Sequence, residues 1–188
     1  MTAMTTEVLG LPRGRALTGA DLGTMPDDGH RYELVDGILL VSPAPRFIHQ
    51  VTAGNVYTAL RAACPPHLQV IFAPFDVTLA SDTVIQPDVF VAPTSSFTDR
   101  DLPAAPLLAV EVLSPSTKGM DTLLKKDRLR RAGCTHYWIV DPDEPSATAW
   151  SLRGDEYELI GHATGDQHLT ITEPFGLSLT PAELIRPA

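Results

Sequence analysis

The chain has 188 residues and a mass of 20.3 kDa, with 44% hydrophobic and 20% charged residues, a composition typical of one ordinary globular domain. Its net charge of −9 counts against a broad nucleic-acid-binding face, which is normally basic, although carboxylates gathered around a cation would also make a chain acidic. The two cysteines, Cys64 and Cys134, predict neither a zinc site nor a disulfide framework, and no stretch approaches the ~20 apolar residues that span a bilayer. We therefore expect a soluble, cytoplasmic protein with no membrane partner.

The N-terminal part predicts a flexible arm over residues 1–16, followed by a single domain over residues 17–188. Residues 18–22 predict a short capped helix. Residues 32–41 predict a β-hairpin, because two apolar runs are joined by Asp36-Gly37, a strong turn signal.

The central part alternates between helices and strands. Apolar residues recur at helical spacing from 46 to 63, and Pro65-Pro66 would end that helix. A basic helix is expected over residues 121–132, ended by Gly133, with Arg128 and Arg131 on its solvated face. Strands are expected at 69–79 with a bend at Pro74, 88–91, 107–113, 136–140, 148–152, 156–160 and 169–171. This order predicts an α/β (α+β) domain with a mixed sheet against helices and a small C-terminal β extension.

Two acids stand in apolar strands. Glu111 interrupts the run 107–113, and burial of a carboxylate there is unfavourable unless a cation compensates it. The alternative is a strand-end glutamate paired with an arginine or lysine. Asp88 starts a second apolar strand after Pro87. If the two strands are neighbours, Asp88 and Glu111 converge on one ion, and hard oxygen ligands point to Mg²⁺ (or Mn²⁺). The main-chain carbonyl of Val112 is a further candidate ligand.

Lys125 is the candidate catalytic lysine. It shares a helix face with Leu129, so it can lean toward the sheet and orient a water or offset negative charge. The neighbouring Lys126 is left open as an alternative for the same role.

The motifs, taken in order, resemble the Uma family of restriction endonucleases within the PD-(D/E)xK nuclease superfamily, over about residues 32–142 and more weakly to 184. The motifs that carry the resemblance are Tyr32-Glu33-Leu34-Val35-Asp36-Gly37, His49-Gln50, Pro87-Asp88-Val89, Val110-Glu111-Val112-Leu113-Ser114-Pro115-Ser116-Thr117, Asp121 with Lys125, Ala132-Gly133 and Tyr137-Trp138-Ile139-Val140-Asp141-Pro142.

The resemblance implies a restriction endonuclease-like core, with Asp88 and Glu111 as the two motif acids. The superfamily lysine normally stands two residues after the second acid, where this chain has Leu113; the Uma-type pattern instead matches Lys125. Glu33 matches a further family acid and is a candidate metal ligand. His49 matches a recurring histidine with a candidate substrate-binding role, the alternative being a histidine satisfied within its helix.

These features predict a Mg²⁺-dependent endonuclease that hydrolyses phosphodiester bonds, with DNA as the first candidate substrate. A nuclease fold kept as a non-catalytic binding or scaffold protein is the alternative, favoured by the acidic pI and by Leu113. A metal-dependent hydrolase of a small phosphorylated molecule is a third reading. A homodimer is expected, since two sites related by a two-fold axis most simply cut both strands of a duplex.

Overall fold

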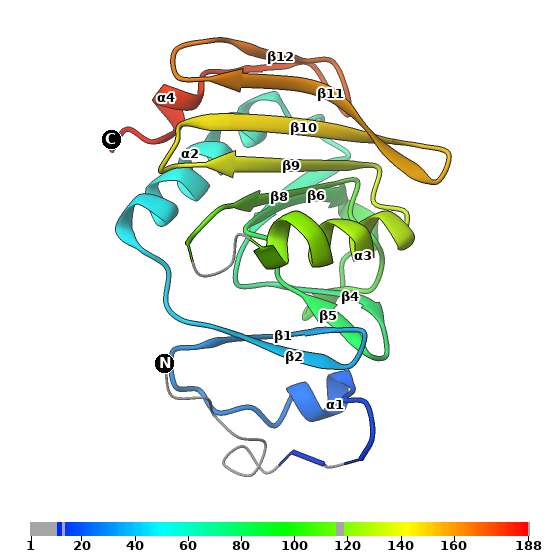
Figure 1. The fold of residues 1–188 in the computed structure, drawn as a ribbon. Helices are drawn as coiled ribbons and strands as arrows, with labels where there is room; N and C mark the ends of the chain where they lie inside the picture. Colours follow the sequence, from blue (N-terminus) through cyan, green and yellow to red (C-terminus); the bar gives the residue numbers. More distant parts are fainter. Residues whose placement is uncertain (1–10, 13, 116–118, 188) are drawn as a thin grey trace.

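The computed structural model describes residues 11, 12, 14–115 and 119–187, so most of the predicted N-terminal arm lies outside the described residues. The chain forms two main sheets with helices against them (Figure 1). In spatial order, the six-stranded sheet contains β11 (Glu156–Thr164), β10 (Ser146–Arg153), β9 (His136–Asp141), β8 (Leu108–Val112), β6 (Val89–Pro93) and β3 (Leu68–Phe72). The five-stranded sheet contains β2 (Ile38–Ser42), β1 (Arg31–Val35), β5 (Thr83–Ile85), β4 (Asp76–Ala80) and β7 (Asp101–Leu102).

Short elements complete the fold. A two-stranded sheet pairs β12 (Leu169–Ile171) with β13 (Leu177–Leu179). The helical segments are α1 (Gly19–Leu22), α2 (Phe47–Ala63), the 3₁₀ turn η1 (Thr94–Ser96), the π-helical segment η2 (Met120–Lys125), α3 (Lys126–Arg131) and α4 (Pro181–Leu184). In the described part of the chain, no helix has both the length and the apolar run needed to cross a membrane.

The predicted mixed α+β architecture is confirmed, and its centre is the parallel pair of β8 and β9. The two strands are joined by a crossover that runs through η2 and α3, as parallel strands require. Both strands are buried along their whole length, which explains their nearly continuous apolar sequence. Glu111 lies in the middle of this buried region.

The hairpin of β1 and β2 is formed as predicted. Val35 pairs with Ile38 across a two-residue turn in which Asp36 and Gly37 have φ of 49° and 76°, the conformation that a tight hairpin favours. A Cβ at Gly37 would lie 2.7 Å from that of Ala16, so the close approach of the chain also requires glycine here.

One predicted strand is wrong in its extent. Residues 69–79 form two strands in different sheets, β3 and β4, because the chain leaves the first sheet around Pro74 and enters the second. The sequence also did not predict β5, β7 or β13, which have only two or three residues and therefore show no alternation.

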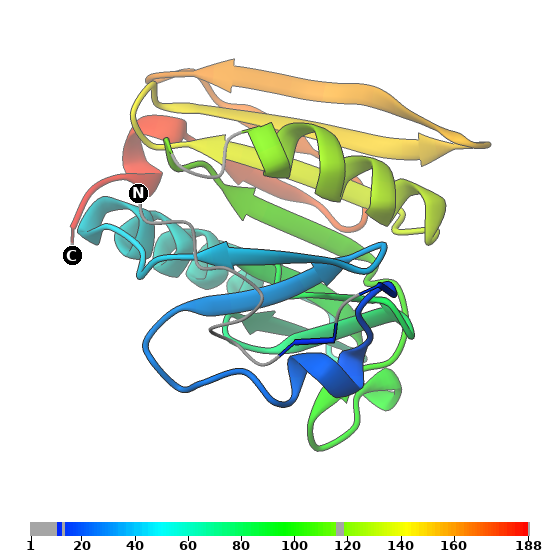
Figure 2. The same cartoon turned by 60° about the horizontal axis from the view of Figure 1, so that its bottom comes forward.

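The six-stranded sheet carries a different layer on each face. Helix α2, α4 and the β12–β13 pair share one apolar cluster with the sheet, with Val56, Leu60 and Val110 fully buried in it. The five-stranded sheet and α3 share a second cluster on the opposite face, with Leu129 and Tyr137 fully buried. Figure 2 shows α2 on one side of the large sheet and the five-stranded sheet below it. The candidate site residues described below lie where the two sheets meet.

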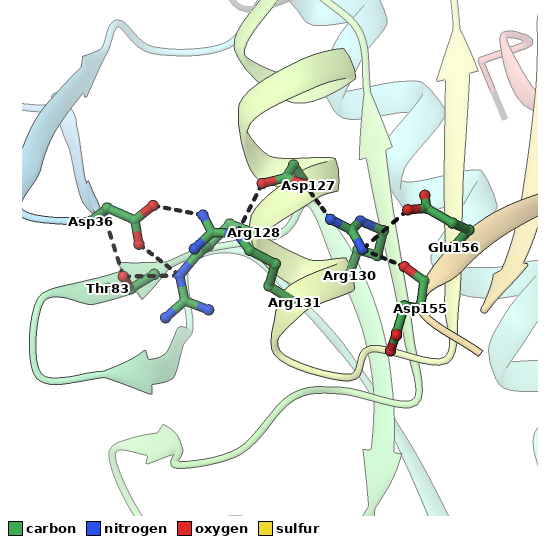
Figure 3. Close-up of polar contacts among 8 residues, drawn as sticks. All are labelled: Asp36, Thr83, Asp127, Arg128, Arg130, Arg131, Asp155 and Glu156. Atoms are coloured by element: carbon green, nitrogen blue, oxygen red, sulfur yellow. Dashed lines mark hydrogen bonds and ion pairs between the residues drawn. The ribbon is translucent and has the colours of Figure 1, made fainter. Parts of the chain in front are cut away.

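The arginines of α3 tie this helix to the hairpin turn (Figure 3). Arg128 Nε lies 2.9 Å from Asp36 Oδ1 and donates to Thr83 Oγ1 at 3.3 Å. Arg131 Nη2 lies 2.6 Å from Asp36 Oδ2. The prediction that Arg128 stays solvated is wrong: Arg128 is only 9% exposed, because Asp36 and Thr83 supply acceptors that replace water.

On its other side α3 reaches the turn between β10 and β11. Arg130 donates to the main-chain carbonyl of Asp155 and lies 3.7 Å from Glu156 Oε1 (Figure 3). Helix α3 is therefore held from both sides, by the small sheet and by the large one.

Two arginines that share Asp36 allow a matched test of this anchoring. We expect Arg128→Ala to lower the free energy of unfolding by about 2–3 kcal/mol, because a buried hydrogen-bonded charge is removed. Arg131→Ala should cost below about 1 kcal/mol, since the Arg131 side chain is 44% exposed. Urea unfolding followed by circular dichroism measures both. Equal losses in the two variants would contradict the buried anchoring role of Arg128.

Candidate active site

Sheet register brings the two predicted acids together. Strands β6 and β8 are antiparallel neighbours in which Val89 pairs with Val110. Continuing that register by one residue places Asp88 opposite Glu111 on the same face of the sheet. Both side chains are buried, as are Glu33 on β1 and Lys125 at the end of η2. The site is thus built from both sheets and from the crossover helix.

The Lys125 ammonium links the two glutamates. Its Nζ lies 3.0 Å from Glu33 Oε1 and 3.4 Å from Glu111 Oε1, and the side chain is only 2% exposed. A buried charge is tolerated when opposite charges and hydrogen bonds surround it, so these contacts account for a lysine in the core. Glu33 Oε1 also accepts the main-chain N–H of Gln86 at 2.7 Å.

Asp88 is held by three donors. Arg31 Nη1 lies 2.9 Å from Oδ1, while His49 Nε2 at 3.2 Å and the Val112 main-chain N–H at 2.8 Å approach Oδ2. Burial alone would raise the pKa of Asp88, but the hydrogen bond from His49 and the charges of Arg31, His49 and Lys125 outweigh it and hold the pKa well below its ordinary value. Asp88 is therefore a carboxylate throughout the neutral range.

Arg31 is the site residue that sequence reasoning missed. Besides Asp88 it approaches Glu33, with 3.5 Å between Arg31 Nε and Glu33 Oε2. Burial on its own would lower the pKa of Arg31, but the charges of Glu33, Asp88 and Glu111 raise it. The sequence did contain an indication of this. Residues i and i+2 of a strand share a face, so a strand that points Glu33 into the site also points Arg31 there.

The structure separates the two lysines that the sequence left open. Lys125 contacts the acids, whereas Lys126 Nζ lies 3.5 Å from the centroid of the Trp150 ring, a cation–π contact outside the acid cluster. Leu113, at the usual position of the superfamily lysine, is buried in the apolar cluster under α3. The side chain of Asp121, another residue of the resemblance, lies outside the described part.

The donor set suits a hard cation held by few protein ligands. Within the residues that the structure describes, no three His, Cys, Asp or Glu side chains are grouped closely enough to hold a metal ion. Mg²⁺ is nevertheless often bound through one or two carboxylates plus waters and phosphate oxygens. Asp88 and Glu111, opposite each other, fit that pattern. Glu33 and the Val112 carbonyl stay predicted ligands. The Glu33 carboxylate contacts Lys125, and Val112 uses its N–H, not its carbonyl, to contact Asp88.

A cleft of about 1040 Å³ leads to this cluster. Arg31, His49 and Asp88 line it, while Glu33, Glu111 and Lys125 are not among its lining residues and adjoin it through Asp88 and Arg31. His49 Nδ1 is buried and has no hydrogen-bond partner among the described residues. A ligand entering from the cleft therefore meets Arg31, Asp88 and His49 first.

A family model and a solved structure that match this chain agree with each other. The Uma2 family model, described as "Putative restriction endonuclease", matches residues 20–182. A crystal structure described as a "putative nuclease belonging to DUF820" from Anabaena variabilis ATCC 29413 superposes with a TM-score of 0.68 at 20% identity, covering 90% of this chain and 97% of that one. At that identity the likeness shows the fold. No curated protein matches the chain.

The lowered pKa of Asp88 predicts how the stability contributed by this residue depends on pH. A folded-state pKa below the unfolded value of about 3.9 means that the carboxylate stabilises the fold fully above that value and loses its contribution as pH falls through the folded pKa. We expect Asp88→Asn to lower the free energy of unfolding by about 1–3 kcal/mol across about pH 5–8, and this gap to wild type to narrow below about pH 4.

Urea unfolding at a series of pH values measures the gap. Asp143→Asn is the control, since Asp143 is an exposed acid paired with Arg46, and it should differ little from wild type throughout. A gap for Asp88→Asn that widens on acidification would contradict the assignment.

Proposed function

Since this chain belongs to the Uma2 family, we propose that it is a Mg²⁺-dependent endonuclease that hydrolyses phosphodiester bonds in nucleic acid, with DNA as its substrate. Nuclease function is what the family supports. The observation that carries the finer proposal is the convergence of Asp88, Glu111 and Lys125 with Arg31 at the inner end of one cleft.

Asp88 and Glu111 are the residues that would hold the ion. When bound, Mg²⁺ (or Mn²⁺) supplies a water of lowered pKa and polarises the phosphoryl oxygens. Asp88 is suited to this because its charge persists at neutral pH and its orientation is fixed by His49 and the Val112 N–H. Glu33 and the Val112 carbonyl are the further candidate ligands.

The two cations take different positions in the proposed reaction. Arg31 lines the cleft, so its guanidinium is placed to contact a phosphate oxygen and to offset the charge that develops there. Lys125 lies behind it between Glu33 and Glu111, where its ammonium contacts both carboxylates and orients them. His49 orients Asp88 through Nε2, while its Nδ1 is buried and has no hydrogen-bond partner among the described residues.

A non-catalytic binding protein of the same fold is the competing proposal. The net charge of −9 and the engagement of Lys125 and Arg31 by acids favour it. A panel of plasmid, single-stranded DNA, RNA and nucleotides separates the readings: no turnover in Mg²⁺ or Mn²⁺ supports the binding protein, and turnover of nucleotides alone supports a hydrolase of small phosphorylated molecules.

Isosteric replacement of the acids tests the metal site. Asp88→Asn and Glu111→Gln should each reduce Mg²⁺-dependent cleavage by at least about 100-fold, because each removes one of two negative ligands of the ion. Mn²⁺ binding, measured by isothermal titration calorimetry, should weaken in the same variants. Glu158→Gln on the exposed edge strand β11 is the control and should behave as wild type. Wild-type cleavage rates in either site variant would overturn the assignment.

The quaternary state is a separate expectation. If the enzyme cuts both strands of a duplex through two sites related by a two-fold axis, the particle in solution should have about twice the chain mass of 20.3 kDa. Light scattering at assay concentrations measures this. A mass near that of one chain would contradict the homodimer.

A further inference from the structure

The cleft extends well beyond the acid cluster along helix α2. His49, Ala53 and Tyr57 follow one another at intervals of four residues, so they share one face of the helix, and all three line the cleft. Eight residues of helix rise about 12 Å, so this wall runs about 12 Å away from the histidine that contacts Asp88. The cleft therefore has a polar end at Asp88 and an apolar end at Tyr57.

Phe72 adds an aromatic ring to the cleft beside Tyr57. It is the last residue of β3 and pairs with Val89, so its ring lies on the α2 face of the sheet, while the main chain that follows it bonds to the carbonyl of Asp88. Its ring packs against Tyr57 in an edge-on arrangement with centroids 5.0 Å apart and an interplanar angle of 71°. Phe72 is nevertheless 56% exposed, and it lines the cleft. A large apolar ring is thus presented to whatever occupies the cleft.

The charges along the walls argue against duplex DNA as the occupant of the cleft itself. Both arginines that line it are ion-paired: Arg31 with Asp88, and Arg46 with Asp143 at 2.7 Å. Duplex binding relies on neutralising many phosphates with basic side chains, whereas single-strand binding draws a further part of its free energy from the stacking of bases on aromatic rings. An aromatic wall with few unpaired cations matches the second mode.

We propose that this cleft binds a single-stranded segment of nucleic acid, with one base stacked on Phe72 and the adjoining phosphate directed toward Arg31 and Asp88. The proposal rests on the nuclease function proposed above and specifies its substrate as a single strand or a locally opened duplex. A volume of about 1040 Å³ lies at the upper end of pockets that enclose drug-sized ligands, which is enough for a base and its neighbouring sugar-phosphates.

Binding without turnover tests the proposal. The probe is a fluorescein-labelled oligo-dT of about 12 nucleotides, within the usual size of single-strand sites, compared by fluorescence anisotropy with a duplex of the same length. Wild-type protein in EDTA keeps the probe intact. We expect the single strand to bind more tightly than the duplex, and Phe72→Ala to weaken single-strand binding by about 5- to 100-fold, the effect of losing one stacked base.

Three further variants make the result specific to stacking. Phe72→Leu keeps an apolar contact to Tyr57 but lacks a π-face, so it should bind as weakly as Phe72→Ala; Phe72→Trp should bind as tightly as wild type. Phe47→Ala is the matched control, because Phe47 is 73% exposed at the start of the same helix yet does not line the cleft, and it should bind as wild type. Unchanged thermal unfolding of each variant shows that the change in binding is not a loss of fold.

The outcomes distinguish this inference from the proposed function. Equal binding by Phe72→Ala and wild type, equal losses in Phe72→Ala and Phe47→Ala, or tighter binding of the duplex would each overturn the single-strand cleft, even if metal-dependent cleavage is observed. Conversely, Phe72-dependent binding of the single strand without any cleavage in Mg²⁺ would support the cleft and overturn the nuclease.

Discussion

One buried ammonium joins the two sheets of this protein. Lys125 leaves the crossover between β8 and β9 and contacts Glu33 on the small sheet and Glu111 on the large one. Without that cation, two glutamates would face each other in a region with little water, which is strongly unfavourable. The packing of the sheets against each other and the geometry of the acid cluster therefore depend on the same contact, and the candidate active site lies between the two layers.

A second ion pair, between Arg128 and Asp36, lies closer to the surface than the pair between Lys125 and Glu33. Arg128 follows Lys125 by three residues, and Asp36 follows Glu33 by three, so the helical segment and the hairpin are joined by two successive ion pairs. Because Arg128 also donates to Thr83 on β5, the helix cannot rotate about its axis without breaking both contacts. The outer pair thus restricts the direction in which Lys125 points, although it lies outside the acid cluster.

The sequence predicted those parts of the site that appear as exceptions within a regular pattern. Glu111 stood out because its strand is otherwise apolar, and register alone then sets Asp88 opposite it. Arg31 did not stand out, because a charged residue at the start of an exposed-looking hairpin is ordinary; only the second sheet, formed by residues distant in sequence, buries it against Asp88. The error over residues 69–79 has the same cause, since a change of sheet leaves no local periodicity. Arg128 was wrongly predicted to be solvated because its acceptors, in the hairpin turn and on β5, are distant in sequence.

An acidic protein can bind nucleic acid if the two ends of the cleft contact different parts of the strand. The acidic end would contact the phosphate through a bound cation, and the apolar end would contact the bases. At the inner end, carboxylates dominate and would draw in a divalent cation, which in turn brings positive charge to the phosphate. Along α2 and the end of β3, an apolar wall that carries Tyr57 and Phe72 can bind bases without neutralising phosphates. Arg31 stands between these regions, paired with Asp88 yet partly exposed to the cleft. A strand held on the aromatic wall would carry its phosphate toward Arg31 and Asp88, so under the proposed function the cleft that binds the strand would also set where it is cut.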